Sequence, residues 1–161
     1  MKSPINGYAL GGGLQVAMAC DLRIASENAR MGQTEINIGL IPGWGGTERL
    51  TRLIGATKAK ELVFTGKMID AKTAEQLGLV NMVVPREKFR EMVCQFALEL
   101  AQKALVALKA AKALINKGSE ISLDAAIALE REGFGVVAST EDLQEGVSAF
   151  IERRKPMFEG K

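Results

Sequence analysis

The sequence contains no histidine, and this absence excludes more chemistry than any other feature of the composition. Without imidazole, the chain's own residues cannot form the Ser-His-Asp or Cys-His arrangements of nucleophilic catalysis or a histidine-based metal site. Catalysis by this chain would have to rest on carboxylates and backbone groups. We therefore expect no metal site.

Cysteines, aromatic residues and excess charge are also scarce. Cys20 and Cys94, both among apolar residues, make neither a disulfide framework nor a metal cluster, which favours a reducing cytoplasmic location. Six Phe, one Trp and one Tyr leave few rings for base stacking, and a net charge of +2 provides no basic face. No apolar run approaches the ~20 residues of a membrane span. We expect neither nucleic acid nor a membrane as a partner.

Glycine, in contrast, is abundant, with 17 residues in a chain of 161. Up to residue 85 the pattern predicts an α/β region that opens with a strand, a glycine loop, a helix and a strand. Asp70 is suited to cap a helix that Gly78 ends in a left-handed conformation. The predicted helices cover residues 14–19, 47–53, 57–64 and 71–77, and the predicted strands cover residues 21–25, 29–31 and 79–84.

From residue 86 the pattern changes to amphipathic helices. Phe89, Val93, Phe96 and Leu100 are spaced 4, 3 and 4 residues apart and predict one apolar stripe. Further helices are expected over residues 105–117 and from a Ser122 cap through residue 129. A last helix is expected to start near Thr140, with Ser139 and Asp142 at capping-box spacing. The basic residues at 153–155 would lie in its final turn and complement the helix dipole. We therefore predict two parts, an α/β part at residues 1–85 and a helical part at residues 86–161.

The glycine triplet at positions 11–13 is the most informative local feature. Glycines at a helix start leave backbone N–H groups uncovered where they have no partner and where the dipole favours negative charge. This arrangement is typical of an oxyanion site. Glu35 follows some twenty residues later and can serve there as a proton carrier.

Three segments, in their order and spacing, resemble the enoyl-CoA hydratase/isomerase (crotonase) family over the whole chain. They are residues 5–13 with residues 19–22 behind them, residues 32–35 with the second glycine cluster at 42–47, and residues 71–80. The resemblance implies a crotonase-like (ClpP/crotonase) spiral of ββα units and a helical C-terminal oligomerisation region. Its N-terminal part is expected to be incomplete, because family members carry roughly a hundred more residues before the glycine loop.

The resemblance also implies a substrate and partners. It implies an acyl-CoA thioester, in which coenzyme A is part of the substrate, so that no separate cofactor is expected. Gly12 matches one of two backbone donors to the thioester oxygen, and the other belongs to the segment that precedes this chain. Substrate contacts are expected from Tyr8, Ala9, Leu10, Gly11 and Gly43. The expected partners are further copies, as a trimer or a dimer of trimers, or a separate N-terminal chain.

Gln15 departs from the family pattern, since hydratases carry a second glutamate there. A glutamine amide orients a water but carries no proton at neutral pH. The leading hypothesis is a hydratase with Glu35 as acid and base, Gln15 as the water-orienting partner and Gly12 as oxyanion donor, with low or no activity in this chain alone.

Two alternatives stay open. One is a Δ3,Δ2-enoyl-CoA isomerase that uses Glu35 alone, and the other is a non-catalytic oligomerising module. Gly43 stands where dienoyl isomerases place an additional acid, which disfavours that subtype. Trp44 is interpreted as a packing residue.

Overall fold

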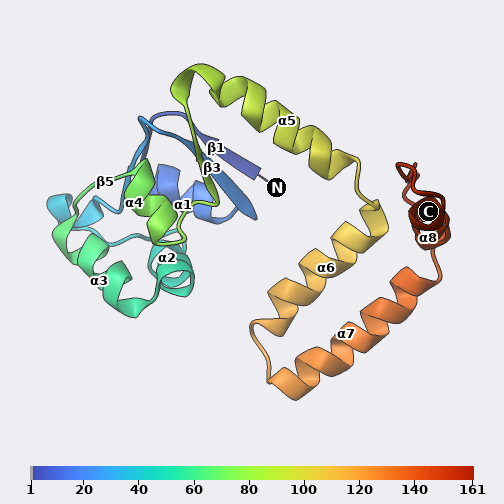
Figure 1. The fold of residues 1–161 in the computed structure, drawn as a ribbon. Coiled ribbons are helices and arrows are strands. Elements are labelled where there is room, and N and C mark those ends of the chain that lie inside the picture. The colour runs from blue at the N-terminus through green and yellow to red at the C-terminus, as the bar shows by residue number, and fades with distance from the viewer. Residues whose placement is uncertain (1) are drawn as a thin grey trace. The chain divides into compact units, whose positions relative to one another are not determined.

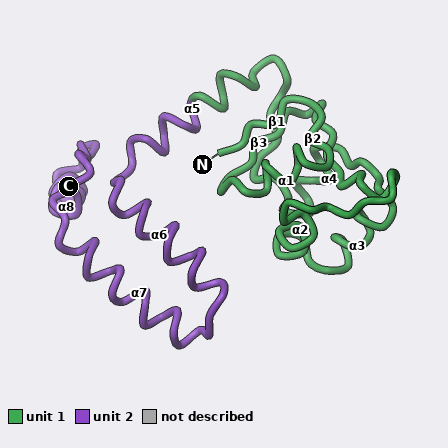
Figure 2. Tube along the Cα trace, turned by 180° about the vertical axis from the view of Figure 1, so that it is seen from behind, with its two compact units in different colours: residues 1–94 green, residues 95–161 purple. Residues whose placement is uncertain are grey.

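A computed structural model describes residues 2–161 of the chain. It divides into two compact units, residues 1–94 and residues 95–161 (Figure 2). The boundary lies within helix α5 (Phe89–Ala101), whose first turns belong to the first unit. Compactness does not by itself define a domain, so the division predicted after residue 85 stays a prediction.

The first unit is built on two small sheets (Figure 1). One sheet holds three parallel strands in the order β1-β3-β6, and the other has the order β2-β4-β5, with β5 antiparallel to β4. Successive strands β1 to β4 alternate between the sheets, as a spiral of ββα units requires. The bounds are β1 (Lys2–Ile5), β2 (Tyr8–Leu10), β3 (Leu22–Ser26), β4 (Arg30–Gly32), β5 (Ile69–Asp70) and β6 (Met82–Val84).

Short helices connect these strands and enclose a core of aliphatic side chains. Leu14, Met31, Leu50 and Leu79 are fully buried in one cluster. The four helices predicted before residue 80 are confirmed. The bounds are α1 (Gly12–Met18), η1 (Glu35–Ile38), α2 (Gly46–Ile54), α3 (Ala56–Thr65), α4 (Ala71–Gln76) and η2 (Arg86–Lys88).

The start of α4 is as predicted, whereas the strand that follows is shorter than predicted. The Asp70 carboxylate accepts from the Thr73 N–H at 2.8 Å, and this hydrogen bond lowers the pKa of Asp70. Gly78 has a φ of +74°. The strand prediction from residue 79 is wrong because the N–H of Leu79 donates back to Ala74 O at 2.8 Å, so that pairing begins only at Met82.

In the second unit, helices α6 (Leu105–Gly118) and α7 (Leu123–Ala138) lie side by side (Figures 1 and 2). A Cβ on Gly133 would lie only 2.8 Å from Leu114 Cδ1, so this glycine allows close packing of the two helices. Ser122 caps α7 as predicted, but α7 continues nine residues past the predicted end at residue 129. No residue of α6 or α7 is buried.

Helix α8 (Glu141–Glu152) corrects two predictions about its ends. Its cap is the Thr140 hydroxyl, which accepts from the Leu143 N–H at 3.2 Å. Ser139 instead ends α7 and donates its hydroxyl to Val136 O. At the other end, Arg153 takes a left-handed conformation with a φ of 55°. The basic residues 153–155 therefore follow the helix and do not lie in its last turn.

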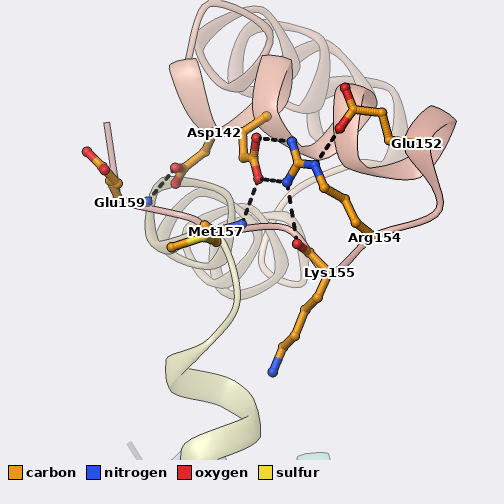
Figure 3. Close-up of polar contacts among 7 residues, drawn as sticks. Asp142, Glu152, Arg154, Lys155, Met157 and Glu159 are labelled. Carbon is orange, nitrogen blue, oxygen red and sulfur yellow. Dashed lines mark hydrogen bonds and ion pairs between the residues drawn. The ribbon is translucent and has the colours of Figure 1, made fainter.

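The C-terminal segment, residues 154–161, folds back on α8 (Figure 3). Arg154 forms a two-pronged ion pair with Glu145, at 2.6 and 2.8 Å, and a second pair with Glu152. The Arg154 guanidinium lowers the pKa of Glu145 to about 2. The buried Asp142 carboxylate accepts from the backbone N–H groups of Glu159 and Gly160, at 2.8 and 3.0 Å. Carboxylates on one face of α8 thus hold this segment.

Candidate active site

The candidate site begins where strand β2 passes into helix α1. The Gly11 N–H donates to Gly32 O at 2.9 Å and so extends the β2–β4 pairing by one residue. Gly11 then adopts φ 50° and ψ −123°, a conformation that L side chains rarely adopt. The chain turns there and enters α1 at Gly12. The first N–H groups of a helix have no carbonyl one turn earlier, so the N–H of Gly12 lies at the position of an uncommitted donor.

Glu35 lies beside this turn. It is half-buried at the start of η1, just after β4, which pairs directly with β2. A Cβ on Gly11 would lie 3.2 Å from Glu35 Oε1 and 3.4 Å from Glu35 Cδ. The structure therefore brings the glycine turn and the carboxylate into one place.

Gln15 projects from the first turns of α1 and is 3% exposed. Its Nε2 donates to Glu35 Oε1 at 2.5 Å, and its Oε1 accepts from the Trp44 N–H at 2.6 Å. Gly46 leaves room for this side chain, since a Cβ there would lie 2.9 Å from Gln15 Cγ. Both ends of the amide are thus engaged by the protein, which links α1, η1 and the second glycine cluster.

Gln33 is a further site residue, to which the sequence pattern assigned no role. Its side chain is fully buried, one residue after β4. With its nitrogen turned toward Glu35, it donates to both carboxylate oxygens, at 3.1 and 3.2 Å. The opposite orientation places the amide oxygen against the carboxylate and gains only a 3.5 Å contact from Gln15 Nε2. We assign the donating orientation, because an ionised carboxylate only accepts hydrogen bonds. The sequence offered only an amide two residues before the carboxylate as a signal, because the burial of Gln33 is visible only in the structure.

Trp44 was interpreted from sequence as packing, and the structure leaves its side chain 73% exposed. The edge of the indole lies against the helix start, since a Cβ on Gly12 would lie 2.9 Å from Trp44 Cζ3. Both backbone polar groups of Trp44 are hydrogen-bonded. Its N–H donates to Gln15 Oε1, and its carbonyl accepts from Arg49 Nη1 at 2.8 Å. One edge of the ring therefore packs against the start of α1, as the interpretation as a packing residue expects, while most of the ring is exposed.

The other residues predicted to contact substrate belong to β2, which leads into the glycine turn, and to the turn before Trp44. Tyr8 is 78% exposed at the start of β2, Ala9 is buried in the core and Leu10 is half-buried. Gly43 is exposed in the turn before Trp44, and a Cβ there would meet nothing closer than Ile41 O at 4.0 Å. Their contacts with a substrate stay predictions.

Among residues 2–161, no group of three or more His, Cys, Asp or Glu side chains is placed to hold a metal ion. Within the same range, no helix is both long and apolar enough to cross a membrane.

Comparison with known proteins decides the family. The family model for enoyl-CoA hydratase/isomerase matches residues 3–161. The chain belongs to the enoyl-CoA hydratase/isomerase family. It is 48% identical over 151 residues to a short-chain-enoyl-CoA hydratase of Clostridium acetobutylicum, covering 94% of this chain and 58% of the relative. It is 47% identical over 146 residues to a short-chain-enoyl-CoA hydratase of Clostridioides difficile, covering 91% of this chain and 94% of the relative.

Solved structures of this family confirm the crotonase-like fold. The enoyl-CoA hydratase of Bacillus anthracis superposes with a TM-score of 0.94 at 42% identity, covering 96% of this chain and 60% of that one. The enoyl-CoA hydratase of Mycobacterium tuberculosis gives a TM-score of 0.91 at 34% identity, covering 96% and 62%. The chain thus spans about three fifths of the length of most of these family members.

Proposed function

We propose that this chain carries the acid–base part of an enoyl-CoA hydratase site, which adds water to a 2-enoyl-CoA. The observation that carries the proposal is the Glu35 carboxylate, held by Gln15 at the glycine turn where α1 begins. Relatives named as hydratases at 43 to 48% identity support the same reaction class.

Each group has a role in this proposal. The thioester oxygen accepts from the N–H of Gly12, which stabilises the negative charge that develops on it during the reaction. Glu35 takes a proton from the attacking water and returns a proton to the α-carbon. Gln15 fixes the carboxylate and carries no proton itself. One donor of an oxyanion site contributes on the order of 10²-fold to 10³-fold in rate.

A second candidate is an enoyl-CoA isomerase, and one observation favours it. Gln15 stands where hydratases of the family carry a second glutamate, and its amide holds Glu35 and the Trp44 N–H but carries no proton, so that Glu35 is the one proton carrier of this pair. An isomerase requires only that one carboxylate take a proton from one carbon of the acyl chain and return it to another. Glu35 alone suffices for that exchange. Because Gln15 supplies no second proton carrier, we expect slow hydration by this chain.

Two substrates separate the candidates. The purified chain is incubated with crotonyl-CoA and, separately, with a 3-enoyl-CoA, in water enriched in ¹⁸O, and the products are measured by mass spectrometry. A 3-hydroxyacyl-CoA carrying ¹⁸O supports the hydratase, whereas interconversion without ¹⁸O supports the isomerase.

Two variants show whether turnover depends on the proposed carboxylate. Glu35→Gln removes it, and Glu48→Gln is the matched control on the exposed surface of α2, where Glu48 pairs with Arg52. Glu35→Gln should abolish product formation, and the control should leave it unchanged. If product forms and Glu35→Gln is as active as the unmodified chain, the proposed function is wrong.

We also propose that the second unit assembles copies of this chain, as a trimer or a dimer of trimers. Ile115, Leu123 and Phe134 on α6 and α7 are 71 to 74% exposed, and Phe150 on α8 is 85% exposed. Exposed apolar side chains at this density are typical of interaction surfaces. Light scattering of the purified chain tests the proposal, and a well-behaved monomer would contradict it.

The unpaired Cys20 and Cys94 fit the proposed cytoplasmic location, where thiols stay reduced.

A further inference from the structure

Trp44 combines an anchored backbone with an uncovered ring. Its N–H is bound by Gln15 and its carbonyl by Arg49, while 73% of its surface is open. The structure therefore presents an exposed indole on an anchored stretch of backbone, with one edge of the ring against Gly12.

This surface adjoins the two groups on which the proposed chemistry depends. The indole edge rests against Gly12, close enough that a single methyl group there would overlap with Cζ3. The Trp44 N–H is joined to Glu35 through one side chain, Gln15. A thioester that places its oxygen at the Gly12 N–H and its α-carbon at Glu35 has its acyl group within van der Waals reach of this ring.

We infer that the Trp44 indole is the apolar wall on which the acyl chain of the thioester lies, and that it determines the preference for acyl-CoA over free coenzyme A. The inference rests on the proposed function. Aromatic rings supply large contact area with few rotatable bonds, so a pre-positioned indole binds an apolar chain at low entropic cost. The role is substrate selection, because an indole offers no group that exchanges protons with carbon.

Trp44 is the single tryptophan of the chain, so its fluorescence reports directly on the site. The purified chain is titrated with butyryl-CoA, a saturated thioester that cannot be hydrated, and separately with free coenzyme A. Calorimetry measures the binding of both in parallel. We expect butyryl-CoA to produce a saturable change in indole emission at the dissociation constant that calorimetry gives, and free coenzyme A to produce a much smaller one.

A relocated probe provides the matched control. Phe64, near the end of α3, is 70% exposed, comparable to Trp44. The double variant Trp44→Phe with Phe64→Trp should bind butyryl-CoA while its emission stays constant. An equal response from both probes would mean that the signal comes from absorption by the ligand or from a general change of the protein, and the inference would be wrong.

Substitution at position 44 tests the energetic role. Trp44→Ala should weaken butyryl-CoA binding about tenfold, as expected for uncovering part of an indole face, and leave the affinity for free coenzyme A within twofold. Trp44→Phe should recover most of the loss. Equal weakening of both ligands would overturn the inference.

Failure of the inference and failure of the proposed function are distinguishable. If butyryl-CoA binds by calorimetry while the indole emission and the Trp44→Ala affinity stay unchanged, only the inference is wrong. If no acyl-CoA binds at any concentration, both are wrong.

Discussion

Replacement of Asp142 should release the C-terminal segment and lower the free energy of unfolding. The Asp142 carboxylate is 3% exposed and accepts two backbone N–H groups, from Glu159 at 2.8 Å and Gly160 at 3.0 Å. Hydrogen bonds to charged groups contribute about 1.5 to 3 kcal/mol each. Because the released N–H groups regain water as partners, we expect Asp142→Ala to cost about 2 to 3 kcal/mol in total.

Glu141 provides the matched control for this measurement. It precedes Asp142 in the same first turn of α8 and is exposed. Glu141→Ala also removes an acidic side chain from the helix N-terminus, where the dipole contribution is about 0.5 kcal/mol. The difference between the two variants therefore isolates the two hydrogen bonds of Asp142 from the general effect of negative charge at this position.

Urea denaturation followed by circular dichroism gives the two free energies of unfolding. Amide hydrogen exchange gives a second, local measurement, in which Asp142→Ala should remove the protection of the Glu159 and Gly160 N–H groups and Glu141→Ala should preserve it. Equal free energies for the two variants, together with intact protection at Glu159, would refute the idea that Asp142 holds the segment.

Three further predictions concern the site and the C-terminal segment. Gln33→Leu should reduce kcat at least tenfold with little change in KM or stability, because Glu35 loses the amide that holds both of its oxygens; an unchanged kcat would contradict a positioning role. Arg154 lowers the pKa of Glu145 to about 2 from 4.5, so the ion pair stabilises the fold fully above pH 4.5 and is lost as the pH falls toward 2. The NMR signal of the Met157 N–H, which donates to Glu145, should change over this pH range. Arg154→Ala should move the midpoint of that change to higher pH. Gly12→Ala should displace the neighbouring indole and shift its emission maximum without lowering the melting temperature, and an unchanged spectrum would contradict the contact.

The local pattern predicted the elements of the first unit because each has a clear start or stop signal. Asp70 and Gly78 bracket α4, and the glycine triplet marks the entry to α1. The strand before residue 82 failed because a tertiary contact, from the Leu79 N–H to Ala74 O, prevailed over β propensity. Propensity is local, whereas this hydrogen bond depends on how α4 ends.

The sequence predicted part of the site, namely the part that lies in motifs with a recognisable spacing. The glycine turn and Glu35 belong to motifs whose spacing is visible in the sequence, and the structure places them together. The buried amide of Gln33 and the exposed ring of Trp44 are visible only in three dimensions, because residue type alone predicts the opposite burial for each. Similarly, Arg154 pairs with Glu145 nine residues away, whereas the sequence pattern predicted the dipole of α8 as its partner.

The side-chain amide of Gln15 has nearly the shape of a carboxylate. It forms one hydrogen bond to Glu35 and one to the Trp44 N–H. An exchange of its nitrogen for oxygen, as in Gln15→Glu, would replace the donor to Glu35 by a second acceptor, so that the two carboxyl groups could stay this close only by sharing a proton.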